Sequence, residues 1–113
     1  MRLINQTKNT ILAEEIFFAD SSLKRLRGLL GKKELAKGRA LIIKPCSSVH
    51  SFFMQFTIDL IFLDQQNRVV KIIPNFKPFR ITRPYFNAVS VVELPSGTIN
   101  SSATEIADSL SLE

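Results

Sequence analysis

The feature that most constrains the fold is a pair of strand-length apolar segments joined by a short polar turn. Residues 58–63 read Ile-Asp-Leu-Ile-Phe-Leu, with apolar side chains at both odd and even positions. A strand of this pattern needs cover on both faces, so it belongs in the interior of a sheet. Residues 69–73 form a second apolar segment, and residues 65–68 supply a tight connection. The sequence therefore predicts an antiparallel hairpin inside a β-sheet.

Other strand-length segments flank this hairpin on both sides. Residues 11–18 are rich in β-branched and aromatic side chains, and residues 40–43 form an apolar run that ends before a proline. Residues 88–94 resume the strand pattern, and residues 108–112 provide a last short strand. Because turn residues separate all of these segments, they favour a sheet of short strands with tight connections.

Helical patterns are short. Leu23, Leu26 and Leu30 recur at helical spacing, and Asp20 precedes them with a side-chain oxygen suited to an N-cap. Residues 100–102 offer caps for a further helical turn. We therefore predict a mainly β fold, a small barrel or sandwich of about 5–7 mostly antiparallel strands with one short helix.

The length and hydropathy of the chain limit its organisation. With 113 residues it has the size of one domain, so we expect residues 1–113 to form a single domain. No window approaches 18 consecutive apolar residues, and no apolar run of secretory length follows the N-terminal residues. One cysteine, Cys46, agrees with a reducing compartment. We expect a soluble cytoplasmic protein without a membrane span.

His50 and Asp59 are the first candidates for chemistry. On an uninterrupted strand they would point to opposite faces, roughly 30 Å apart at about 3.3 Å per residue. They can pair only if the chain bends between them, near residues 55–57. Asp59 would then orient His50 as a base or binding group near neutral pH. The alternative is that each polar side chain satisfies buried backbone groups beside a strand.

Cys46 precedes His50 by four residues and is the second candidate. A Cys–His pair oriented by Asp59 would supply the nucleophile of a thiol- or His/Asp-dependent hydrolase. Free cysteine is also among the most buried residue types, which makes a structural Cys46 the alternative. The same three residues are zinc-ligand types, but no second cysteine or histidine completes a site, so we predict no metal and no cofactor.

A basic, aromatic segment follows the hairpin. Residues 68–83 carry five basic groups and no acid, and the aromatic side chains interleaved with them are Phe76, Phe79 and Tyr85. Aromatic groups for stacking and cations for phosphates are the ingredients of single-strand nucleic-acid grooves. The candidate nucleic-acid-binding cations are Lys77, Arg80 and Arg83. The alternative is a proline-rich loop that buries its phenylalanines and exposes its cations to solvent.

Three segments together resemble a known family. They are Arg25-x-x-Gly28-Leu29-Leu30, then the sixteen positions from Val49-His50-Ser51-Phe52-Phe53-Met54 to Asp64, and then Val92-Glu93-Leu94-Pro95-x-Gly97 with a late Asp108. This pattern is similar to the bacterial and archaeal family called domain of unknown function 192 (DUF192). The resemblance covers almost the whole chain. It implies a compact, mainly β domain with one short helix, and it names no biochemical activity.

Two positions depart from the family pattern. The family often has proline where Thr57 stands, and proline would impose the bend that a contact between His50 and Asp59 requires. The family often has glycine where Ala107 precedes Asp108. An alanine at this position predicts that the backbone avoids the left-handed conformation there.

The leading functional hypothesis is a non-enzymatic module that binds a small molecule or a peptide. Polar and charged side chains converge on otherwise apolar segments, which is the usual composition of a ligand pocket. We predict that this pocket lies beside His50. The predicted ligand-binding residues are Arg25, His50, Met54 and Asp59. The hydrolase and the single-strand nucleic-acid protein remain the alternatives.

Overall fold

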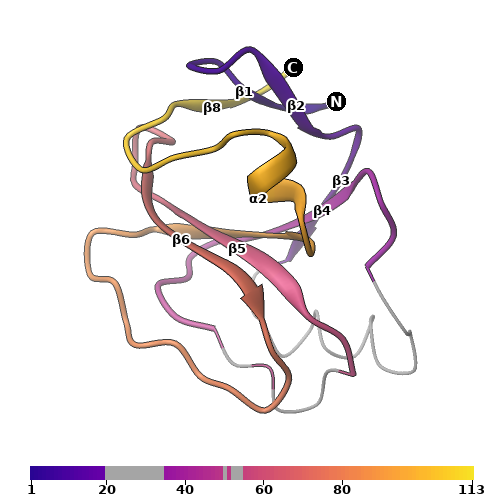
Figure 1. Cartoon of the computed structure of the whole chain (residues 1–113). Helices are drawn as coiled ribbons and strands as arrows, with labels where there is room; N and C mark the ends of the chain where they lie inside the picture. Colours follow the sequence, from indigo (N-terminus) through magenta and orange to yellow (C-terminus); the bar gives the residue numbers. More distant parts are fainter. Residues whose placement is uncertain (20–34, 50, 52–54) are drawn as a thin grey trace.

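Two β-sheets packed face to face appear in a computed structural model that describes residues 1–19, 35–49, 51 and 55–113 (Figure 1). The smaller sheet has the order β2-β1-β8, and the larger has the order β3-β4-β7-β5-β6. Neighbouring strands are antiparallel except β3 and β4, which run parallel. The strands are β1 (Leu3–Asn5), β2 (Thr10–Ala13), β3 (Glu15–Ala19), β4 (Arg39–Ile43), β5 (Ile58–Leu63), β6 (Val69–Phe76), β7 (Ser90–Pro95) and β8 (Leu110–Leu112).

The hairpin expected from the two apolar segments lies in the larger sheet. β5 pairs antiparallel with β6 on one side and with β7 on the other, and all six of its residues are buried. A strand with apolar groups on both faces is stable only where both faces are covered, which is the position that β5 occupies. The predicted interior hairpin is confirmed. β7 is the middle strand of the five.

The segment expected as one strand over residues 11–18 forms two strands in different sheets. β2 ends at Ala13 and β3 begins at Glu15. The backbone N–H groups of Glu14 and Glu15 both donate to the carbonyl of Gly38, at 2.8 and 3.1 Å. These bonds fix the point where the chain passes from the smaller sheet to the larger, so the single-strand prediction was wrong at this position.

A single helical turn, α2 (Thr98–Ser101), lies in the described part of the chain. Its N-cap is Gly97, which has a φ of 97°, and residues 100 and 101 lie within the helix, so the prediction that residues 100–102 cap a following helical turn was wrong. Glycine adopts this φ without the steric cost that a Cβ brings. The amphipathic helix expected after Asp20 falls outside the described residues.

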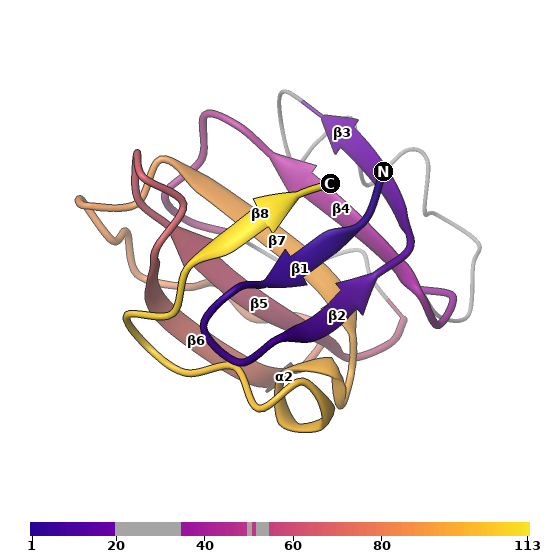
Figure 2. The same cartoon turned by 90° about the horizontal axis from the view of Figure 1, so that it is seen from above.

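The two faces of the larger sheet are covered differently. One face packs against the smaller sheet and α2, where a cluster that includes Leu3, Ile61, Val92 and Ile99 is buried between the layers. Seen from above, the smaller sheet crosses over the larger one, and the two chain ends lie side by side on it (Figure 2). The opposite face is covered by segments outside the sheets, with a separate cluster that includes Phe62. We call these faces the sheet-covered face and the loop-covered face.

Ala107 has a φ of 79°, so the prediction that this position avoids the left-handed conformation was wrong. The tertiary contacts explain the conformation. Its N–H donates to the Val69 carbonyl, and the Val69 N–H donates to the Asp108 carbonyl, both at 2.8 Å. This pair of bonds to the start of β6 holds the backbone on both sides of Ala107 and outweighs the clash of its Cβ.

The mainly β fold with mostly antiparallel strands and one short helix is confirmed. The described residues contain eight strands, more than the roughly five to seven expected, because several are only three or four residues long. The two sheets form an open sandwich and do not close into a barrel. Among the described residues, no helix has the length and apolar character needed to cross a membrane.

Candidate ligand-binding site

Asp59 is a buried carboxylate whose two oxygens accept backbone N–H groups. It lies on β5 with no exposed surface. Its Oδ1 accepts from the Asn75 N–H at 3.0 Å, and its Oδ2 accepts from the N–H groups of Gly97 and Ile99 at 3.1 and 2.8 Å. The carboxylate therefore joins the end of β6 and the first turn of α2 to β5. This is the backbone-satisfying role that the sequence left open as an alternative.

The chain bends at Gln55 and Phe56, just before β5 begins at Ile58. A bend in this position is what a contact between His50 and Asp59 would require. Three predicted site residues lie outside the described residues: Arg25, His50 and Met54. The catalytic and ligand-binding roles assigned to these residues and to Asp59 therefore stay predictions.

Cys46 and Asp59 lie on opposite faces of the larger sheet. Cys46 packs against the cluster on the loop-covered face, together with Val49 and Leu60. Asp59 alternates with Leu60 along β5 and bonds to Ile99, which belongs to the cluster between the two sheets. The structure therefore does not bring the Cys46 thiol and the Asp59 carboxylate together on one face.

Cys46 lines a shallow depression on the loop-covered face. The depression has a volume of about 410 Å³ and is lined by Pro45, Cys46, Ser47, Ser48, Ala88 and Val89. The Cys46 thiol donates to the Ser48 carbonyl at 3.0 Å. Two hydroxyl groups and several apolar side chains thus surround one concave surface.

The segment after Cys46 is held against the loop between β6 and β7 by backbone hydrogen bonds. The N–H of Cys46 donates to the Val89 carbonyl at 3.0 Å, and the N–H of Tyr85 donates to the Ser47 carbonyl at 3.0 Å. The Thr82 side chain accepts from the Val49 N–H at 2.9 Å. The two segments therefore form one layer over the larger sheet although they lie far apart in the sequence.

Ser51 anchors the other end of this layer and has no exposed surface. Its N–H donates to the Arg80 carbonyl at 2.8 Å, and its carbonyl accepts from the Phe79 N–H at 2.9 Å. Its hydroxyl donates to the Lys77 carbonyl at 2.6 Å and accepts from the Arg80 N–H at 3.0 Å. One serine therefore fixes both the direction and the curvature of the chain at residues 77–80.

The aromatic residues of the basic segment divide into two groups. Phe76 is buried, and Tyr85 packs on Phe62 with ring centroids 4.8 Å apart. Phe79 is instead largely exposed, as are the cations Lys77, Arg80 and Arg83. The nucleic-acid role of these three cations stays a prediction, and two of the three aromatic groups expected to stack serve the core.

Glu93 is a second fully buried carboxylate, on β7. It pairs with Leu60 of β5 and Leu41 of β4, and it alternates with Val92 and Leu94, which belong to the cluster between the sheets. Its side chain therefore belongs to the loop-covered face. An ionisable group in the middle strand of a sheet is costly to bury unless it is paired or hydrogen-bonded.

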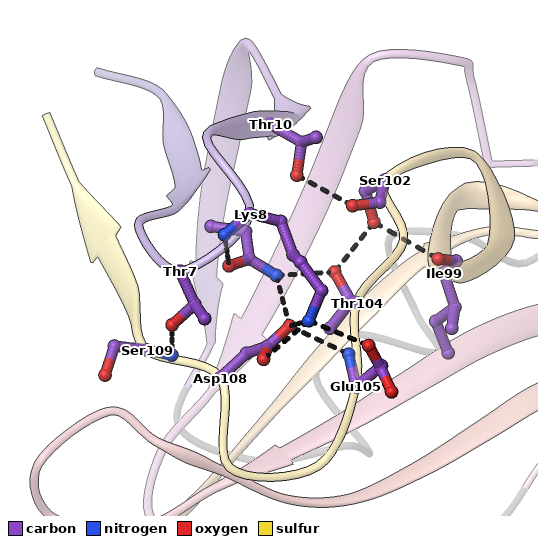
Figure 3. Close-up of polar contacts among 10 residues, drawn as sticks. Thr7, Lys8, Thr10, Ile99, Ser102, Thr104, Glu105, Asp108 and Ser109 are labelled. Atoms are coloured by element: carbon purple, nitrogen blue, oxygen red, sulfur yellow. Dashed lines mark hydrogen bonds and ion pairs between the residues drawn. The ribbon is translucent and has the colours of Figure 1, made fainter.

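A polar network joins the two ends of the chain above the sheet-covered face (Figure 3). The Asn5 amide donates to the Thr104 hydroxyl at 3.1 Å and to the Asp108 carboxylate at 2.9 Å. The Lys8 ammonium lies 3.0 Å from Asp108 and 2.9 Å from Glu105. All the contacts drawn there join groups within the chain, so the network stabilises the fold.

Two groups in this network have shifted pKa values. Burial by itself raises the pKa of the Asp108 carboxyl, but hydrogen bonds from Asn5, from the Glu105 N–H and from Lys8 outweigh it and hold that pKa below its ordinary value. Hydrogen bonds to Glu105 and Asp108 raise the pKa of the Lys8 ammonium above its ordinary value. Both shifts keep the pair charged over the neutral range.

Metal-ligating side chains do not gather in the described ranges. Within residues 1–19, 35–49, 51 and 55–113, no group of three or more His, Cys, Asp or Glu side chains is placed to hold an ion. The absence of a metal and of a cofactor remains a prediction.

Comparisons with known proteins now identify the family. The model of the DUF192 family, described as "Uncharacterized ACR", matches residues 3–112. The chain belongs to this family. The UPF0127 protein PH1112 of Pyrococcus horikoshii is 36% identical over 113 residues, which cover 96% of each chain. A UPF0127 protein of Thermococcus sibiricus is 33% identical and matches 98% of this chain and 74% of its own length.

Solved structures agree with the fold of this DUF192 chain. A protein of unknown function from Novosphingobium aromaticivorans superimposes with a TM-score of 0.78, covering 99% of this chain and 84% of its own. The sequences are 18% identical, so the likeness shows the fold alone. The DUF192 resemblance drawn from the sequence motifs is confirmed by the family match.

Two buried polar residues of this DUF192 chain on the loop-covered face, Glu93 and Ser51, were not among the predicted site residues. Glu93 carries a visible signal, because it is an acid within the otherwise apolar run of β7. Ser51 carries no such signal, because its importance comes from carbonyl and amide partners 26 to 29 positions away in the sequence. Local sequence patterns do not report contacts of that separation.

Proposed function

We propose that this protein is a non-enzymatic module that binds a small molecule or a short peptide on its loop-covered face, beside Cys46 and near His50. The observation that carries the proposal is the depression of about 410 Å³ lined by residues 45–48, 88 and 89. Its size falls in the range of small-ligand sites, and its lining combines apolar side chains with a few hydroxyl groups. This composition favours recognition of a partly apolar ligand with hydrogen-bonding groups.

Cys46 and Asp59 have different roles in this proposal, because they lie on opposite faces of the larger sheet. Arg25, His50 and Met54 join Cys46 as ligand contacts. Asp59 acts from the sheet-covered face by holding β5, with both oxygens already accepting backbone N–H groups. The separation of Cys46 from Asp59 supports a binding function over a thiol hydrolase, because a nucleophile needs its orienting acid within hydrogen-bond reach of the base. In this proposal the protein acts in the cytoplasm.

A fragment titration tests the site. The full chain, isotope-labelled, would be titrated with a library of small aromatic amides and carboxylates and with capped tripeptides while amide resonances are followed. We expect saturable shifts at Cys46, Ser47 and Val89. Ser48→Trp places a large ring in the depression and should abolish these shifts, while Ser101→Trp, a matched exposed change on α2, should keep them. Shifts that survive Ser48→Trp, or a library without hits, would contradict the proposal.

Alkylation of Cys46 separates the binding module from the enzyme alternative. We measure the rate of reaction with iodoacetamide against pH and expect its midpoint at or above about pH 8.5, as for an ordinary cysteine. A thiol that titrates far below this value would contradict the non-enzymatic assignment. Cys46→Ser should retain fragment binding, because a binding surface does not need a nucleophile.

A further inference from the structure

Three large apolar side chains project from the loop that joins β6 to β7. Phe79, Ile81 and Phe86 are exposed over 68%, 66% and 91% of their surfaces. Single exposed apolar residues are ordinary on protein surfaces, but clusters of exposed apolar residues often mark interaction sites. Here three lie within eight residues of one loop. We call residues 77–88 the apolar–basic loop.

The same loop presents three exposed cations, Lys77, Arg80 and Arg83. In the part of the chain that the structure describes, no carboxylate forms an ion pair with any of the three. Residues 65–92 contain no acidic residue at all. The loop therefore combines apolar side chains with a positive potential that favours an anionic surface.

The loop is held in a defined shape. Phe79 adopts a φ of 60°, a conformation that is uncommon for a bulky residue and needs support from its surroundings. The carbonyl and hydroxyl of the buried Ser51 supply that support through the N–H groups of Phe79 and Arg80. A loop that is already ordered loses less conformational entropy when it docks.

We propose that the apolar–basic loop docks on an anionic lipid bilayer, with Phe79, Ile81 and Phe86 in the interfacial region and Lys77, Arg80 and Arg83 on the lipid phosphates. Apolar insertion and attraction to anionic headgroups act together in interfacial binding, and the cytoplasmic leaflet supplies the anionic lipids. This inference goes beyond the ligand site proposed above.

A bilayer fits these side chains better than single-stranded nucleic acid does. Base stacking needs aromatic faces, whereas the exposed set includes the aliphatic Ile81. Of the aromatic groups expected to stack, Phe76 is buried and Tyr85 packs on Phe62. Projecting side chains suit insertion into an interface more than they suit a groove that tracks a strand.

Single-tryptophan variants test the docking directly, because the chain has no tryptophan of its own. Phe79→Trp and Phe86→Trp would be mixed with vesicles of phosphatidylcholine with or without phosphatidylserine. We expect a blue shift of the emission only with phosphatidylserine. Phe18→Trp is the matched control, because Phe18 is 60% exposed on β3, and we expect no shift there. A shift at position 18 alone, or no shift at any position, overturns the proposal.

Co-sedimentation with the same vesicles measures the two contributions. Lys77→Gln, Arg80→Gln and Arg83→Gln together should weaken binding roughly 100-fold, at about fivefold for each cation. Phe79→Ser, Ile81→Ser and Phe86→Ser together should weaken it by about tenfold or more. The control replaces three exposed cations elsewhere and should change binding only a few fold: Arg2→Gln, Lys37→Gln and Arg68→Gln.

Two further outcomes overturn the proposal. Equal losses in the two cation variants would show attraction to net charge without a docking loop. The second outcome is tighter binding to an oligouridine than to phosphatidylserine vesicles, together with quenching of the Phe79→Trp emission by the oligouridine and no change of that emission with the vesicles. This result would assign the loop to nucleic acid. Thermal melts of every variant keep loss of folding apart from loss of docking.

Discussion

Each face of the larger sheet contains a fully buried acidic side chain, and the surroundings of the two side chains differ. Asp59 on the sheet-covered face accepts three backbone N–H groups that belong to elements next to it in space. Glu93, on the loop-covered face, lies one strand away, opposite Leu60. Asp59 thus accepts hydrogen bonds from backbone groups of neighbouring elements. Glu93 lies beneath the layer that carries the depression and the apolar–basic loop.

The comparison extends to the surroundings of each carboxylate. The sheet-covered face is closed by the smaller sheet, α2 and a polar network that joins Asn5 and Lys8 to Asp108. The loop-covered face is closed by segments without regular strands, and these expose Phe79 and Phe86. Regular elements thus cover one face and irregular segments cover the other, and irregular segments are where binding residues are commonly found in proteins.

Removal of the Asp59 carboxylate should have the largest effect on the sheet-covered face. We expect Asp59→Ala to lower the free energy of unfolding by roughly 4 kcal/mol, since the buried N–H of Ile99 and the partly buried N–H groups of Asn75 and Gly97 lose their acceptor. Urea denaturation measures the change. Asp64→Ala is the matched control, because Asp64 accepts the Gln66 and Arg68 N–H groups at an exposed turn and should cost about 1 kcal/mol. Similar costs for the two variants would contradict this role.

Asp108→Asn should have the next largest effect, roughly 2 kcal/mol, because it weakens the hydrogen bonds to Lys8 and Glu105. The lowered pKa of Asp108 also sets the pH dependence. The stabilisation is fully present above the unfolded pKa of about 3.9 and is lost as the pH falls through the folded pKa. The urea midpoints of the wild type and of Asp108→Asn, compared from about pH 2 to about pH 7, measure this loss of stabilisation. A difference that stays constant into acid would break the assignment.

Ser51→Ala tests the loop-covered face and should cost about 1–2 kcal/mol, because the hydroxyl links the Lys77 carbonyl to the Arg80 N–H. Hydrogen exchange sharpens the test. The Arg80 amide should exchange faster, while the Ile99 amide, held by Asp59 on the other face, should keep its relative protection. Equal acceleration of both amides would show that the two faces do not act independently.

Ala107→Gly should have the smallest effect and the opposite sign. At a φ of 79° a Cβ is unfavourable, so we expect glycine to stabilise the protein by about 0.5–1 kcal/mol. Ala36→Gly is the control, because Ala36 is exposed and is not among the described residues with positive φ, and it should be neutral or slightly destabilising. A loss of stability in Ala107→Gly would contradict this account.

Features set by residues close together in the sequence were predictable, and features set by residues far apart in the sequence were not. The hairpin of β5 and β6 was predictable, because its apolar pattern and its turn lie within one short stretch of chain. The division of residues 11–18 was not, since it depends on the carbonyl of Gly38. The left-handed Ala107 was predicted wrongly, because bonds to Val69 outweigh the local preference of alanine.

For the candidate site, the residue types were predictable from the sequence, but their placement in space was not. Its residue types, an acid within a buried strand and a basic aromatic loop, were visible in the sequence. Which acid faces which layer was not visible, because alternation along a strand assigns residues to two faces without saying what covers either face. Ser51 became prominent only through partners on a loop that follows it by more than 25 residues.

The family, the mainly β character and the interior position of β5 follow from the amino-acid sequence, because motif spacing and apolar periodicity are local properties of the chain. The assembled sheets were needed to show that Asp59 bonds to backbone groups on one face while Cys46 and Glu93 belong to the other. Hydrogen bonds and burial depend on distances in space. Pairs such as Asp59 and Ile99 become neighbours only when the sheets assemble.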